Sequence, residues 1–120
     1  MFKVLWVEIP VKDLERAIKF YETVFDLQPL EIIEEEVRRH ATLNAGGAEP
    51  GASINLTQNF EPSDKGVLVY LSLPDDLSGR LEKVVALGGK IVADKASMGA
   101  GFYAIVLDSE GNNLALYAPN

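Results

Sequence analysis

The chain has 120 residues, of which 48% are hydrophobic and 24% charged, so it is long enough for one globular domain with a hydrophobic core and too short for two independent ones. Its formal net charge of -7 argues against nucleic acid as a partner, because affinity for a phosphate backbone depends on clustered Lys and Arg. The lack of cysteine excludes disulfides and thiolate chemistry, and the lack of a membrane-length apolar run or a signal-peptide pattern predicts a cytoplasmic protein that does not bind membranes.

One helix and several strands are predicted in the first half of the chain. Residues 2–9 (FKVLWVEI) are rich in aromatic and β-branched residues and predict a strand that ends at Pro10, since proline cannot donate to a sheet ladder. Apolar residues at helical spacing then predict a helix at residues 14–25, with Asp13 as its N-cap and its end near Asp26. The remaining elements are three strands at residues 29–36, 38–43 and 52–57 and a loop at residues 45–51.

The same order of elements repeats in the second half, after a segment of linker composition at residues 58–66. Residues 67–73 predict a strand, and residues 77–87 predict a helix that Asp76 caps and Gly88 stops. The remaining elements are a strand at residues 90–93, a small-residue loop at residues 95–101 and a hairpin at residues 102–117 whose turn is at residues 108–112. The repeat predicts two similar β-α-β-β-β units packed together.

Three stretches of this pattern carry a resemblance. They are residues 8–25 (EIPVKDLERAIKFYETVF), 70–92 (YLSLPDDLSGRLEKVVALGGKIV) and 102–117 (FYAIVLDSEGNNLALY). They resemble, in turn, the first strand and helix, the start of the second module and the closing hairpin of the vicinal oxygen chelate superfamily, which includes glyoxalase I, bleomycin-resistance proteins and extradiol dioxygenases. Within it the chain looks most similar to a bacterial branch related to lactoylglutathione lyase.

The resemblance implies an α+β fold in a single domain. Modules at residues 1–57 and 67–120 would form one curled, eight-stranded mixed sheet around a cavity, with the helices on its outer face. Modules of this kind pair within one chain or exchange between two chains, so the resemblance also implies a homodimer. The alternative fold is a ferredoxin-like α+β sandwich, which needs only four strands where the pattern predicts eight.

The resemblance also implies where a metal ion would be held. Metal-dependent members take one ligand from the first and one from the last strand of each module, as a set of two His and one or two carboxylates that holds a divalent ion. The positions that match here are Trp6, Asn55, Val69 and Ala115. These four side chains cannot form a divalent-metal site, and the single His of the chain is too few for a two-His pattern. We therefore expect neither a metal ion nor another cofactor.

Strand alternation predicts which side chains share the cavity with these positions, because residues two apart lie on one face of a strand. If Trp6 faces the cavity, so does Glu8, and Val7 and Ile9 then pack on the first helix. If Ala115 faces it, so does Tyr117, and Leu114 and Leu116 pack on the second helix. The predicted cavity is aromatic and weakly polar, which suits an organic molecule better than an ion.

The predicted ligand-binding residues are Trp6, Glu8, His40, Asn55, Val69, Tyr103, Ala115 and Tyr117. Trp6 offers a flat stacking surface, although it could instead fill the core. Glu8 and His40 are the acid–base candidates. A rim salt bridge for Glu8 and a structural or exposed place for His40 are the alternatives, and Tyr103 could belong to a dimer contact.

Three functional hypotheses follow. The first is a metal-free protein of the bleomycin-resistance type that binds a small organic molecule in the aromatic-lined cavity. The second is a metal-independent or atypical enzyme, an isomerase, epimerase or lyase, that uses Glu8 or His40 as its acid–base group. The third is an interaction module whose cavity is filled by its own side chains.

Overall fold

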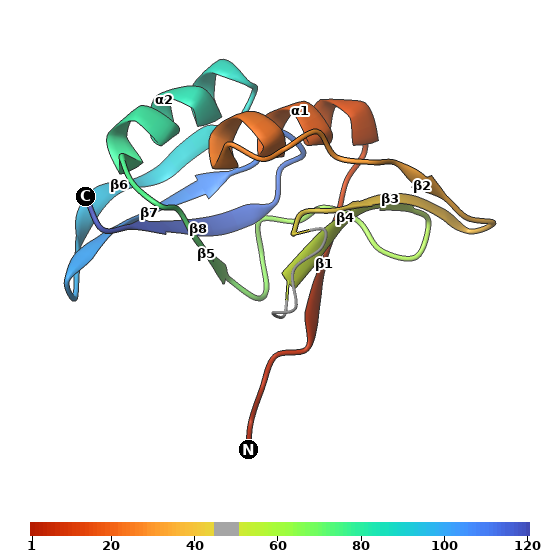
Figure 1. Cartoon of the computed structure of the whole chain (residues 1–120), viewed down its shortest axis with the longest axis horizontal. Coiled ribbons are helices and arrows are strands. Elements are labelled where there is room, and N and C mark those ends of the chain that lie inside the picture. Colours follow the sequence, from red (N-terminus) through yellow and green to blue (C-terminus); the bar gives the residue numbers. More distant parts are fainter. Residues whose placement is uncertain (45–50) are drawn as a thin grey trace.

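The computed structural model describes residues 1–44 and 51–120, and it contains two modules with the same β-α-β-β-β order of elements (Figure 1). The first module consists of β1 (Trp6–Pro10), α1 (Leu14–Phe25), β2 (Ile33–Glu34), β3 (Arg38–Thr42) and β4 (Gly51–Thr57). The second consists of β5 (Val69–Ser72), α2 (Leu77–Ala86), β6 (Lys90–Met98), β7 (Gly101–Leu107) and β8 (Asn113–Ala118). The loop predicted at residues 45–51 lies outside the described residues except for Gly51, which begins β4.

Both predicted helices are confirmed, together with their caps. The carboxylate of Asp13 accepts a hydrogen bond from the Arg16 amide, and Asp26 ends α1 in the left-handed conformation at φ 57°. Asp76 caps α2 by accepting from the Gly79 amide. A hydrogen bond also links the two helices: the buried Arg80 of α2 donates to the Val24 carbonyl in the last turn of α1 at 2.8 Å.

The eight strands form two four-stranded sheets, not the single eight-stranded sheet that we predicted. Their strand orders are β1-β4-β3-β2 and β5-β8-β7-β6, with β1 and β5 parallel to their neighbours and all other pairs antiparallel. In the described part of the chain, β1 and β5 each have a ladder on one side only, so both sheets end in a free edge. Eight strands also exclude the four-stranded ferredoxin-like alternative.

Four strands differ from their predicted lengths by three residues or more. One of them, β5, has only Val69–Ser72 of the predicted 67–73. β6 continues into the predicted loop at residues 95–101 as far as Met98, because register shifts near Ala93 let this small-residue segment keep its pairing with β7. β2 has only two residues of the predicted 29–36. β1 begins at Trp6, and residues 1–5 before it are exposed.

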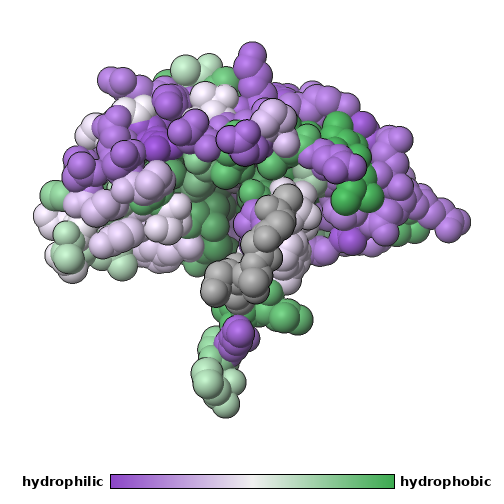
Figure 2. Space-filling model, viewed as in Figure 1, coloured by the Kyte–Doolittle hydropathy of each residue, from purple (hydrophilic) through white to green (hydrophobic). Residues whose placement is uncertain are grey.

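The helices lie together on one side of the two sheets, and the hydrophobic core fills the layer between them (Figure 1). Figure 2 shows hydrophilic residues over the helices and apolar residues in the hollow between the modules and on the projecting N-terminal segment. In the described part of the chain, no helix is long and apolar enough to span a membrane. Because both helices lie on the same side, each sheet has one face buried under a helix and a second face without one.

The turn between β7 and β8 fastens the second module to the first. Asp108 is buried and accepts hydrogen bonds from the amides of Glu110 and Asn112 at 2.8 and 2.9 Å and from the Tyr21 hydroxyl of α1 at 2.5 Å. The side-chain amide of Asn112 donates to the Pro10 carbonyl of β1 at 2.7 Å. Burial, followed by the Asp108 charge, raises the pKa of Tyr21 well above its ordinary value, so this hydroxyl stays a donor.

Glu110 adds a second set of bonds to this turn. Its carboxylate accepts from the amides of Lys12 and Asp13, both at 2.8 Å, and from Arg16 Nε at 2.7 Å. Although burial acts in the opposite direction, the hydrogen bond from Arg16, followed by those from the two amides, lowers the pKa of Glu110 to about 2. We call this set of residues the inter-module junction: Pro10, Lys12, Asp13, Arg16, Tyr21, Asp108, Glu110 and Asn112.

Candidate functional site

The helix-free face of the first sheet carries four of the predicted site residues. The strand register pairs Glu8 with Ser53 and pairs Asn55 with His40, so the side chains of each pair share a face. Trp6 belongs to the same face by alternation. The helix-side face is occupied instead by the buried Ile9, Ile54 and Ala41, which pair with one another. We call the helix-free set the polar face: Trp6, Glu8, Arg38, His40, Ser53 and Asn55.

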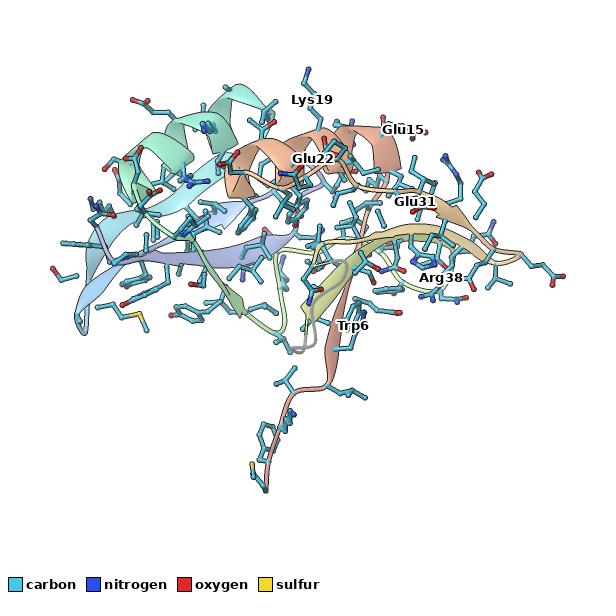
Figure 3. The ribbon with its side chains drawn as sticks, viewed as in Figure 1. Trp6, Glu15, Lys19, Glu22, Glu31 and Arg38 are labelled. Carbon is cyan, nitrogen blue, oxygen red and sulfur yellow. The ribbon has the colours of Figure 1, made fainter. Side chains whose placement is uncertain are left out.

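Arg38, which the sequence did not single out, lies at the centre of the polar face. It starts on β3 and reaches across β4 to β1, where its NH1 donates to Glu8 Oε2 at 2.6 Å and to Asn55 Oδ1 at 3.1 Å. Its Nε donates to Glu35 Oε1 at 2.8 Å. Hydrogen bonds to Glu35 and then to Glu8 raise the pKa of Arg38, so the guanidinium remains charged. Figure 3 shows Arg38 and Trp6 below the sheet, on the side away from Lys19 of α1.

Trp6 is anchored at its nitrogen and open on its ring. Its Nε1 donates to the Ser53 hydroxyl at 3.2 Å, and the Asn55 side-chain amide donates to the same hydroxyl at 3.0 Å. The residue is nevertheless 42% exposed, which contradicts the alternative in which it fills the core. The indole therefore keeps a fixed orientation and leaves apolar surface for contact with another molecule.

The two acid–base candidates both lie beside this arginine network. Glu8 is held by Arg38, the salt bridge that the sequence suggested as its alternative role. His40 Nε2 is buried and lies 2.8 Å from Glu35 Oε1, but the two groups are not oriented for a well-formed hydrogen bond. The hydrogen bond from Arg38, against the effect of desolvation, lowers the pKa of Glu35, so this carboxylate is ionised beside His40.

The helix-free face of the second sheet is aromatic. Ala115 pairs with Tyr70 and with Ile105, and Tyr103 pairs with Tyr117, so these side chains share one face. The rings of Tyr70 and Tyr103 lie 6.4 Å apart at a tilt of 41°. We call this set the tyrosine face: Tyr70, Tyr103, Ala115 and Tyr117. It contains three of the four tyrosines of the chain.

Val69 does not share the face of Ala115, as the sequence predicted, although it lines both grooves between the modules. It pairs with Leu114, a core residue on the helix side of the sheet, so it belongs to the face opposite Ala115. Tyr70 takes the place expected for Val69 on the helix-free face. The signal was present in the sequence, because assigning Leu71 to the core would have turned Tyr70 to the other side by alternation.

Two grooves run between the modules. The larger has a volume of about 810 Å³ and is mostly apolar; Val7 and Phe25 line it from the first module, and Val69, Tyr70 and Leu71 from β5. The smaller has a volume of about 420 Å³ and is lined by Trp6 and Glu8 of the polar face, by Val69 and by residues of the segment between the modules. The candidate site is the smaller groove with the polar face beside it, because Trp6 and Glu8 of the polar face line this groove and no residue of that face lines the larger one.

The residues at the four matched positions do not fit a divalent metal. Trp6 and Ala115 offer no ligand atom, and neither Val69 nor Tyr70 places a His or carboxylate in β5. The amide oxygen of Asn55 is already bonded to Arg38. Among residues 1–44 and 51–120, no group of three or more His, Asp or Glu is placed to hold a metal ion.

The fold and the order of elements agree with a family-model match. The model of the Glyoxalase/Bleomycin resistance protein/Dioxygenase superfamily matches residues 3–116. The chain belongs to this superfamily. Glyoxalase-superfamily structures also share its fold, including a glyoxylase/bleomycin resistance protein/dioxygenase domain from Frankia sp. EAN1pec, at a TM-score of 0.74 and 15% identity over 100% of this chain and 93% of that one.

Two further relatives agree with this membership. A glyoxalase-related enzyme from Fulvimarina pelagi has a TM-score of 0.73 and 16% identity, over 98% of this chain and 88% of that one. A glyoxylase-like domain-containing protein from Didymella fabae is 29% identical over 115 residues, which cover 92% of this chain and 88% of that protein. At 15% and 16% identity the two structural matches show the fold alone, and the family model shows the membership.

Proposed function

We propose that this superfamily member binds a small organic molecule in the groove beside Trp6 and does so without the metal ion of its metal-dependent relatives. The observation that carries the proposal is the half-open indole of Trp6, fixed through Ser53 at the mouth of a groove that Glu8 also lines. A rigid aromatic platform beside hydrogen-bonding groups is typical of organic-ligand sites. Bleomycin-resistance proteins and relatives of lactoylglutathione lyase are the branches whose roles agree best with this proposal.

The proposal is tested by asking what the purified protein binds. Trp6 is the only tryptophan, so its indole N–H gives a single side-chain signal in an amide correlation spectrum. We expect aromatic compounds from a fragment library to shift this signal and metal salts to leave it unchanged. Calorimetric titration with Ni²⁺, Zn²⁺, Mn²⁺ and Fe²⁺ is the counter-test, since stoichiometric sub-micromolar binding of any of them would contradict the metal-free proposal.

A metal-independent enzyme is the second candidate, and the environment of His40 is the observation that favours it. Its buried Nε2 lies beside the ionised carboxylate of Glu35, and Glu8 lies on the same face. We propose His40 and Glu8 as the proton-transfer groups of such an isomerase, epimerase or lyase. If a substrate is found, turnover that survives both His40→Ala and Glu8→Gln would remove these residues from that role.

We also propose that the protein acts as a homodimer in the cytoplasm. In the described part of the chain, β1 and β5 each have one free edge, and Phe2, Leu5 and Val67 are exposed apolar side chains. Unpaired strand edges and apolar surface are both features that association covers. Light scattering coupled to gel filtration tests this proposal. A dimer of ordinary affinity is associated at about 100 µM protein, so a monomer at that concentration would contradict it.

A further inference from the structure

Arg38 joins β3 to β4 and β1 on the polar face. Its guanidinium bonds both to Asn55 and to Glu8, which lies two residues after Trp6 on the same strand face. Trp6 and Asn55 are the two first-module positions at which the family resemblance implies metal ligands. The structure thus has a fixed positive charge of its own beside these two positions, where the residue types do not fit a metal ion.

The bonds of Arg38 leave one of its nitrogens available. NH1 and Nε make the three contacts to Glu8, Asn55 and Glu35, and no hydrogen bond within the described part of the chain uses NH2. The side chain is 31% exposed, so this nitrogen can be reached from outside the protein. Arg38 lines a groove of about 560 Å³, and its partner Glu8 lines the groove that contains Trp6. Arg38 does not itself line the groove of Trp6, but it borders that groove through Glu8, to which it donates at 2.6 Å.

We propose that Arg38 is a ligand-binding residue, which donates through NH2 to an uncharged oxygen acceptor, such as a carbonyl, of an aromatic molecule stacked on Trp6. This inference rests on the proposed function and names the ligand class of that site. A guanidinium fixed by three hydrogen bonds loses little side-chain freedom on binding, which favours its use as an oxygen-recognising donor.

The charges around Arg38 explain why the acceptor is uncharged. Glu8 and Glu35 contribute two carboxylates against one guanidinium, so the cluster carries a net charge of about -1 when both are ionised. A ligand carboxylate or phosphate would meet this excess negative charge, in a chain whose formal charge is already -7. A carbonyl or hydroxyl oxygen meets no such repulsion and still gains a charge-assisted hydrogen bond.

The neighbouring arginine offers a matched control. Arg39 follows Arg38 on β3 but points to the helix side, where it pairs with Glu34 at 2.8 Å and Glu15 at 3.0 Å. Its side chain is 34% exposed, close to the 31% of Arg38. Replacing either arginine therefore removes one charge and two carboxylate partners, but only Arg38 lies on the polar face.

The experiment uses three small probes of similar size: acetophenone, ethylbenzene and benzoate. Each is titrated into the full chain while the indole signal of Trp6 and the backbone amide signals are followed. We expect acetophenone to bind more tightly than ethylbenzene or benzoate. We also expect Arg38→Met to weaken acetophenone binding about tenfold, the usual scale of a charge-assisted hydrogen bond, and to leave ethylbenzene binding unchanged. Arg39→Met should change neither, and Arg38→Lys should retain part of the acetophenone affinity.

The possible failures are distinguishable. If the probes bind beside Trp6 but Arg38→Met and wild type bind acetophenone equally, the role of Arg38 is refuted while the proposed function stands. If benzoate binds most tightly, the choice of an uncharged acceptor is wrong. If none of the three probes shifts the Trp6 indole signal in the wild-type protein, the aromatic site fails, and the role of Arg38 fails with it. The dispersion of the amide signals reports whether each variant is folded. If Arg38→Met does not fold, Arg38→Lys provides the test, through a partial loss of acetophenone affinity.

Discussion

The inter-module junction and the polar face both contain an Arg–Glu pair, but the two pairs lie in different surroundings. The Glu110 side chain is fully buried and accepts from two amides in addition to Arg16, whereas Glu8 is 43% exposed and is held by Arg38 alone. The junction belongs to the closing hairpin through which the superfamily is recognised in sequence. In this chain the junction therefore holds the two modules together through buried hydrogen bonds, whereas the polar face keeps its charges where water can reach them.

The largest effect is expected at Asp108. Asp108→Ala removes the acceptor of four donors in a buried location, namely the Tyr21 hydroxyl, two backbone amides and the Asn112 side chain. Unsatisfied buried donors are costly, so we expect the free energy of unfolding to fall by about 3–5 kcal/mol. Urea denaturation measures this, with Asp64→Ala in the exposed segment between the modules as the control. A loss below about 1 kcal/mol would contradict a structural role for the junction.

Glu110 should show a smaller effect with a characteristic pH dependence. At pH 7, Glu110→Gln replaces an ionised acceptor of Arg16 and two amides, and we expect a loss of about 2–3 kcal/mol. The pKa of Glu110 in the folded protein is about 2, below its ordinary value of 4.5. A lowered pKa gives stability that is present above the unfolded-state pKa and is lost as the pH falls through the folded-state pKa. The difference between wild type and variant should therefore shrink from about pH 4.5 downwards, towards pH 2.

A matched control for this pH series is Glu15→Gln. Glu15 lies on the first turn of α1 and is paired with an arginine, Arg39, but its side chain is exposed. Exposed ion pairs contribute little to stability, so this variant should unfold at nearly the same urea concentration as wild type at each pH. A pH profile of Glu110→Gln that runs parallel to wild type would contradict the lowered pKa of Glu110.

Tyr21 tests one hydrogen bond of the junction without opening a cavity. Tyr21→Phe deletes only the hydroxyl that donates to Asp108, and the carboxylate keeps its amide donors. We expect a loss of about 1–2 kcal/mol in chemical denaturation, because the acceptor is a buried charged group. The same substitution at Tyr103, on the open tyrosine face, should change the unfolding free energy by less than about 0.5 kcal/mol. Equal effects at both positions would remove the distinction between the junction and the open faces.

The parts of the fold that could be predicted from the sequence are those with local signals. Both helices have an aspartate cap and apolar residues at helical spacing, and these signals need no information from distant residues. The extent of β6 could not be predicted, because its small residues pair with β7 only through register shifts that depend on the partner strand. The division into two sheets depends in the same way on contacts between modules.

The candidate site was predictable only in part, for the same reason. Strand alternation placed Trp6 and Glu8 on one face, and the resemblance matched Asn55 to the same site. The register confirms that these three residues share a face, and it adds His40, whose side the sequence left open. Tyr70, which lies on the tyrosine face and lines the larger groove, was missed because counting seven residues back from the helix cap selected Val69, one position away. Arg38 was missed because its role depends on a long side chain that crosses two strands, and no spacing in the sequence reports that.

Arg38 provides the smallest expected change in stability and the sharpest contrast with the junction. Arg38→Met removes three hydrogen bonds, nearly as many as the four that Glu110 accepts from Arg16 and the two amides, yet we expect only a small loss in the free energy of unfolding. Glu8 and Glu35 are half exposed, so water can hydrate both carboxylates once the guanidinium is gone, whereas the buried Glu110 has no such replacement. Urea denaturation of Arg38→Met and Arg39→Met should give similar small losses, while ligand binding should separate the two variants. A loss at Arg38 as large as that at Glu110 would mean that the polar face is part of the scaffold and not a surface kept available for a ligand.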